Sequence, residues 1–98
     1  NNLDGIKHEL AHLYYINWVI EKKLKHTKKG TNKYKELIDL RARVLNDFKK
    51  YFKFVCEKDP NFDFMAYLKS TEYYTKYMEI DYSTLANIGK IISQYSNV

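Results

Sequence analysis

Apolar side chains recur at alternating spacings of three and four residues over the first 24 positions of the chain. The series is Leu3, Ile6, Leu10, Leu13, Asn17, Ile20 and Leu24. This is the spacing of a helix that packs along a partner helix, and it predicts a helix over residues 3–24. Asn17 is the one polar member. It either fixes the register of the pairing, as Asn does at such positions, or is an amide that is hydrogen-bonded or exposed at the edge.

The same segment carries additional apolar residues outside this series. They are Tyr14, Tyr15, Ile16, Trp18 and Val19, and they extend the apolar surface almost all round the predicted helix. A helix that is apolar on several faces lies at the centre of a bundle or at a subunit interface. We therefore expect this helix to contact more than one neighbour, and we predict a homodimer in which Trp18→Ala weakens association.

A second helix is predicted over residues 32–58 by a broader apolar stripe. Its members are Tyr34, Leu37, Ile38, Arg41, Val44, Leu45, Phe48, Tyr51, Phe52 and Val55. Gly30 between the two segments suits the left-handed end of a helix, and Thr31 or Asn32 can cap the next one. A connection this short predicts an antiparallel helical hairpin. The stem of Arg41 is expected to pack while its guanidinium reaches solvent.

The C-terminal part of the sequence predicts two shorter helices. Asp59-Pro60 is expected to end the second helix and to open the third, with Asp59 as N-cap. That helix is predicted to reach about residue 69, with Phe62, Met65 and Leu68 inward. Residues 70–72 then restart a turn that runs to 78, unless one unbroken helix covers 60–78. The last helix, over 83–94, is predicted by an apolar face of Leu85, Ile88, Ile91, Ile92 and Tyr95. The fold class is all-α, one domain over residues 1–98.

Charge and composition restrict the function classes. The chain has a formal net charge of +5, with +7 on residues 1–58 and −2 on residues 59–98. The lone Cys56 cannot form an intramolecular disulfide, and the longest apolar-looking run, residues 13–20, is far shorter than the roughly twenty residues of a bilayer span. We expect a cytoplasmic protein without a signal peptide or a membrane span. The lysine- and tyrosine-rich make-up is typical of an AT-rich bacterium or its phage.

One short segment matches the sequence motif of a metal site. His8-Glu9-Leu10-Ala11-His12 matches H-E-x-x-H, in which two histidines one turn apart bind zinc and the glutamate acts as general base. Over these five residues the chain resembles the zinc-binding helix of zinc metallopeptidases. The resemblance implies zinc on His8 and His12 and a third ligand, for which Glu21 and Glu36 are available. Both histidines lie opposite the apolar series of their helix, so two polar residues on a solvated face are the alternative.

Lysines gather where the two long helices are joined. The candidate residues for contact with nucleic-acid phosphates are Lys22, Lys23, Lys25, Lys28, Lys29, Lys33 and Lys35. Such a cluster can give salt-sensitive binding without base readout, because lysine contacts the backbone and the chain has only two arginines. The alternative is a solvated helix end that serves solubility.

Tyrosines crowd the C-terminal half of the chain, at positions 67, 73, 74, 77 and 82. Tyrosine is enriched at protein interfaces, and this half of the chain is net acidic, so we favour a protein contact over nucleic acid for these side chains.

The sequence predicts a small non-enzymatic binding or regulatory protein without a cofactor that self-associates or binds another protein. The expected contact residues are Tyr14, Tyr15, Trp18, Tyr73, Tyr74 and Tyr77. Nucleic-acid binding through the lysines is the first alternative, and a zinc-binding or metallopeptidase-like site is the second.

Overall fold

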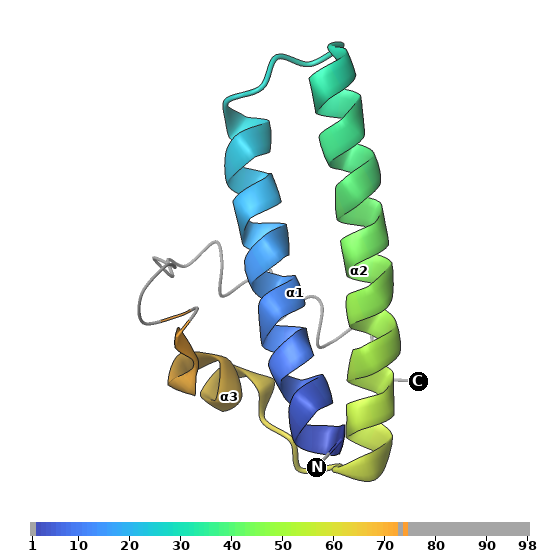
Figure 1. The fold of residues 1–98 in the computed structure, drawn as a ribbon, viewed down its shortest axis with the longest axis vertical. Coiled ribbons are helices and arrows are strands. Elements are labelled where there is room, and N and C mark those ends of the chain that lie inside the picture. Colours follow the sequence, from blue (N-terminus) through green and yellow to red (C-terminus); the bar gives the residue numbers. More distant parts are fainter. Residues whose placement is uncertain (1, 73, 75–98) are drawn as a thin grey trace.

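The computed structural model describes residues 2–72 and 74. This part of the chain forms helices α1 (Asn2–Lys25), α2 (Asn32–Lys58) and α3 (Phe64–Ser70). Helices α1 and α2 run antiparallel as a long hairpin, and α3 packs beside the N-terminal half of α1 (Figure 1). The two predicted long helices are thereby confirmed. The helix predicted over 83–94 lies outside the described residues.

The connection between α1 and α2 is a tight turn. Gly30 has a φ of 87°, a left-handed conformation that side chains with a Cβ rarely adopt. The hydroxyl oxygen of Thr31 then accepts a hydrogen bond from the backbone N–H of Tyr34 at 3.2 Å, which caps the start of α2. The left-handed conformation predicted for Gly30 is confirmed, but Gly30 lies five residues beyond the end of α1 and does not end that helix. Of the two candidate caps the structure uses Thr31. We call this end of the hairpin the tip and the opposite end the foot.

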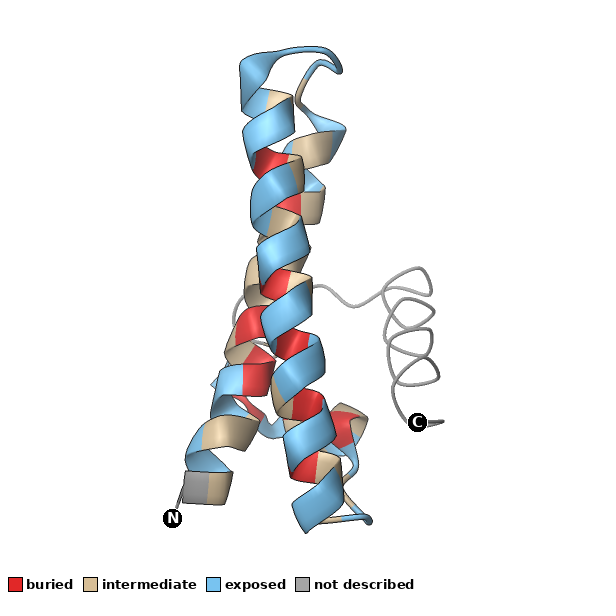
Figure 2. Cartoon of the chain, turned by 90° about the vertical axis from the view of Figure 1, so that its right-hand side faces the viewer, coloured by how far each residue is buried: buried red, intermediate tan, exposed pale blue. Residues whose placement is uncertain are grey.

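The core lies between the two long helices and continues under α3. Its buried apolar residues are Leu10, Ala11, Leu13, Tyr14, Ile20, Leu37, Val44, Phe48, Phe52, Val55, Phe64 and Leu68. Buried positions follow the facing sides of α1 and α2 and are densest toward the foot (Figure 2). Each residue predicted in the two apolar series is buried or half-buried. The alternation of threes and fours therefore identified the packed faces correctly.

Phe64 on α3 is the centre of an aromatic cluster at the foot. It is 2% exposed, and its ring meets Phe48 at 5.3 Å, Tyr14 at 5.8 Å, Phe52 at 6.2 Å and Phe62 at 6.3 Å between centroids. All four pairs are edge-to-face, an arrangement that aromatic quadrupoles favour. Helix α1 thus packs against both α2 and α3, as its surplus of apolar residues predicted.

The prediction that Asp59-Pro60 opens the third helix is wrong. The backbone N–H of Asp59 donates to the carbonyl of Val55 at 2.7 Å, so this residue closes α2, as expected. Its side chain accepts from the N–H of Asn61 at 3.3 Å and is not available as a helix cap. Asp63 caps α3 instead, accepting from the N–H of Ala66 at 3.1 Å.

The later start of α3 changes which side chains face the core. Phe64 and Leu68 are buried, whereas Phe62 and Met65 are only half-buried. The alternative of one unbroken helix over 60–78 is also contradicted. Helix α3 ends at Ser70, and Thr71 has an extended backbone with φ −86° and ψ 159°.

A salt bridge fixes the loop between α2 and α3 to α1. The ammonium of Lys7 lies 3.0 Å from a carboxylate oxygen of Asp59 and 5.0 Å from the centre of the Phe62 ring. The Lys7 side chain is mostly buried, so solvent screens this pair less than a fully exposed one. The contact holds the N-terminal turns of α1 against the loop that positions Phe64.

Candidate functional site

The H-E-x-x-H motif lies on the outer side of α1 near the foot. His8 and Glu9 are exposed and His12 is half-buried. The carboxylate of Glu9, which would be the general base, lies 3.5 Å from the Nδ1 atom of His12. Within residues 2–72 and 74, no three His, Cys, Asp or Glu side chains form a group that could hold a metal ion.

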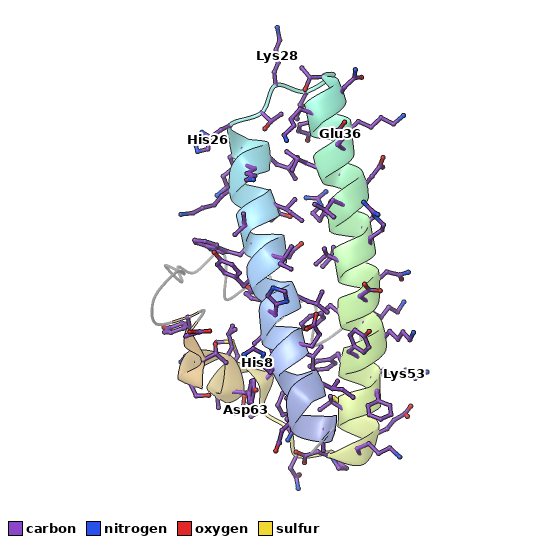
Figure 3. The ribbon with its side chains drawn as sticks, viewed as in Figure 1. His8, His26, Lys28, Glu36, Lys53 and Asp63 are labelled. Carbon is purple, nitrogen blue, oxygen red and sulfur yellow. The ribbon has the colours of Figure 1, made fainter. Side chains whose placement is uncertain are left out.

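Neither acid considered as a third zinc ligand lies near the two histidines. Glu21 is thirteen residues beyond His8 on the same helix, which separates them by about 20 Å along the axis. Glu36 lies near the tip and His8 near the foot (Figure 3). The described chain therefore offers two histidines one turn apart and no third protein ligand beside them. Zinc binding at this motif remains a hypothesis without support from the geometry.

The seven candidate lysines are all exposed and surround the tip. Lys28 projects from the turn away from both helices (Figure 3). Four of them come together around one open hollow of about 470 Å³, which is lined by Lys22, Lys23, Lys25, Lys33, His26 and Thr27. We call this the tip hollow. Among the described residues no carboxylate lines it, so the four lysines give the hollow an excess of positive charge.

Glu21 is the one acid in the last two turns of α1, and it is turned away from the tip hollow. Its carboxylate accepts a hydrogen bond from the guanidinium of Arg41 on α2 at 2.7 Å. Arg41 is half-buried, and its guanidinium pairs with Glu21 across the hairpin, whereas the sequence predicted that it reaches solvent. The positive charge of Arg41 thus offsets the negative charge of Glu21 next to the lysines of α1.

The aromatic residues predicted as contact residues divide into three groups. Tyr14 is 4% exposed and lies in the core against Phe64, so it stabilises the fold and offers no contact surface. Tyr15 and Trp18 stack at 6.1 Å between centroids and are half-buried, as is Tyr74. Tyr73 and Tyr77 lie outside the described residues.

A second hollow, at the foot, was not found from the sequence. It measures about 350 Å³ and is lined by Ile6 of α1 and by Lys50, Tyr51, Lys53, Phe54 and Glu57 of α2. We call it the foot hollow. Phe54 is 41% exposed. The sequence did carry one signal for it, since Phe54 is a large apolar residue outside the stripe of α2.

Cys56 is half-buried near the end of α2, and burial raises the pKa of its thiol, with a smaller contribution from the negative charge of Asp59. Only the thiolate is nucleophilic. We therefore expect iodoacetamide to alkylate the folded protein at pH 8 more slowly than the urea-unfolded chain. The rate should still be rising at pH values where that of the unfolded chain has levelled off. Equal rates in both states, measured by mass spectrometry, would contradict this environment for the thiol.

None of the helices that the structure describes combines the length and the apolar character needed to cross a bilayer. Comparison with protein-family models, with curated proteins and with solved structures finds no match for this chain. The two hollows and the residues that line them are therefore the features of this chain that bear on its function.

Proposed function

We propose that this chain is a non-enzymatic binding module that acts through protein–protein contacts, and that it self-associates through the foot hollow. The exposed Phe54 at the edge of this hollow carries the proposal. A large aromatic ring beside an apolar depression is the arrangement of an interface anchor. This surface differs from the one expected from the sequence, which included Tyr14. The side chain of Tyr14 is buried in the core.

The charges around the foot hollow favour a second copy as the partner. Lys53 and Glu57 line it one helical turn apart. In a twofold interface a residue away from the axis meets a different residue of the other copy, so a lysine of one copy can face the glutamate of the other. A surface that presents both signs of charge around an apolar centre is therefore complementary to itself.

Phe54→Ser tests this proposal. We expect the parent protein to be a dimer at high concentration in size-exclusion chromatography with light scattering, and Phe54→Ser to be a monomer. Leu40→Ser is the matched control, because Leu40 is 38% exposed on the same helix, about 21 Å from Phe54. It should leave the dimer intact.

Two outcomes would overturn the proposed surface. A monomeric parent protein would exclude self-association. A dimer that survives Phe54→Ser and is lost in Trp18→Ala would place the interface on the aromatic face of α1, the surface expected from the sequence. Circular dichroism at 222 nm checks that each variant is folded.

A further inference from the structure

We infer that the tip hollow, together with the ring of Trp18, is a binding site for single-stranded nucleic acid. The four lysines of the hollow would contact phosphates, and an unpaired base would stack on Trp18. This function is separate from self-association and does not depend on it. The two surfaces lie at opposite ends of the hairpin.

The first observation is the uncompensated charge of the hollow. No salt bridge within the described part of the chain neutralises Lys22, Lys23, Lys25 or Lys33. Two acids lie close to them in sequence. Glu21 is held by Arg41, and Glu36, three residues after Lys33, forms no salt bridge with it within the described residues. Lysines at the end of α1 also complement the helix dipole. That role does not account for Lys33, which lies in the first turn of α2, where a positive charge is unfavourable.

The second observation connects the hollow to an aromatic pair. Lys22 lines the hollow, and its ammonium also lies 4.3 Å from the centre of the Trp18 ring. Trp18 in turn stacks on Tyr15. Tyr15, Trp18, Lys22 and Lys25 follow one another at spacings of three, four and three, so they form one stripe along α1. Aromatic rings next to a positively charged groove are the parts from which single-strand sites are built.

The ammonium of Lys22 occupies the place that a base would take. An exposed lysine leaves a ring face easily, because its contact with the ring is weak compared with base stacking. When a strand binds, the ammonium of Lys22 can move to a phosphate and a base can replace it over Trp18. The 7 residues from Trp18 to Lys25 span about 10 Å, the length of roughly three nucleotides in a stacked strand.

The lining favours a single strand over other polyanions. Lysine offers point charges without the planar fork that reads base edges, so binding should be independent of sequence. Bases in a duplex cannot stack on a protein ring. An anionic membrane is a poorer fit, because the turn of residues 26–31 is polar throughout and offers nothing apolar to insert.

Trp18 is the only tryptophan of the chain, so its fluorescence reports directly on the proposed contact. We expect a twelve-residue oligothymidylate to quench this fluorescence at low salt, and the affinity to fall as salt is raised. Replacing Lys22, Lys25 and Lys33 together by Gln should weaken binding at least tenfold and reduce the slope of log affinity against log salt by about 2. Replacing Lys49, Lys58 and Lys69 by Gln changes the net charge equally at exposed positions outside both hollows, and this control should bind like the parent.

A variant of the ring tests stacking separately. Trp18→Leu should weaken binding about tenfold, measured by the fluorescence anisotropy of a labelled oligothymidylate. If this variant does not fold, the two triple lysine variants and the quenching of Trp18 fluorescence in the parent protein still test whether a single strand binds at the tip hollow. Phe54→Ser should bind as the parent does, which separates this site from the dimer interface.

Four results would overturn the inference. The first is no binding of the oligothymidylate at low salt, and the second is an equal loss of affinity in the two triple lysine variants. The third is a duplex that binds as tightly as the single strand without quenching Trp18 fluorescence. The fourth is binding of vesicles containing phosphatidylserine without any binding of oligonucleotide. Each can be measured with the same purified proteins.

Discussion

Phe64→Ala is expected to lower the free energy of unfolding by about 3–5 kcal/mol, the typical loss when a buried Phe is cut back to Ala. Phe64 is 2% exposed and its ring is in contact with rings from α1, α2 and the loop before α3. The substitution removes apolar contact from all of them at once and leaves a cavity. The total free energy of unfolding of a small domain is roughly 5–15 kcal/mol, so the variant should be close to unfolding.

Urea unfolding measures this loss, followed by circular dichroism at 222 nm and by the fluorescence of Trp18. Both signals should change at the same urea concentration if α3 and the hairpin unfold together. Phe54→Ala is the matched control, since it removes the same ring from an exposed position and should cost less than about 1 kcal/mol. A loss at Phe64 as small as the loss at Phe54 would contradict the central position of α3.

Asn17→Leu is expected to raise the free energy of unfolding by about 1–2 kcal/mol. The side-chain carbonyl oxygen of Asn17 is buried, and no described residue donates a hydrogen bond to it. Leaving a buried polar group unpaired costs about 1–3 kcal/mol, whereas an apolar side chain of similar size has no such penalty. This position belongs to the series that packs α1 against α2, so Leu would extend the apolar contact there.

Asn46→Leu provides the comparison for this gain. Asn46 is exposed on α2, so its replacement should change stability by no more than about 0.5 kcal/mol.

The buried side-chain oxygen of Asn17 also bears on the two explanations of this residue that the sequence left open. The buried oxygen without a donor does not fit a fully hydrogen-bonded amide. Asn17 as a whole is half-buried, so an amide at the edge of the contact and a role in fixing register both stay predictions. If Asn17 fixes register, the Leu variant should be more stable but less uniform in oligomeric state by light scattering.

The two long helices were predictable because their signals are strong and local. Each has an apolar series that extends over six or more turns, and Gly30 and Thr31 mark the turn between them. Such signals depend only on neighbours along the chain. The bounds of α2 agree with the prediction at both ends, since a cap, Thr31 or Asp59, lies immediately outside each.

The start of α3 was not predictable in the same way. Asp59 and Asp63 are both good caps, and the sequence favoured Asp59 because a proline follows it. In the structure Asp59 instead makes a tertiary contact, the salt bridge from Lys7 on α1. The same reasoning applies to Phe64, whose central place follows from where α3 begins. Local patterns contain no information about a partner 52 residues away.

The candidate sites were predictable only in part. The cluster of lysines at the tip is evident from the sequence, because the turn brings together residues that are already close along the chain. The engagement of Glu21 by Arg41 and the position of Lys22 over Trp18 are properties of the folded hairpin. The foot hollow depends on Ile6 and Phe54 meeting across two helices, which required the pairing of α1 with α2 to be known in detail.

The uneven distribution of buried side chains along the hairpin implies a gradient of local opening. Toward the foot, the Phe64 cluster joins α1 and α2. The buried residues nearest the tip are Ile20 and Leu37. Segments with fewer buried contacts open at lower free energy than the rest of a protein. Backbone amides in the last turns of α1 should therefore exchange with solvent sooner than those around Leu10. The lysine-bearing end of the molecule would then adjust its shape at little cost while the aromatic end stays closed.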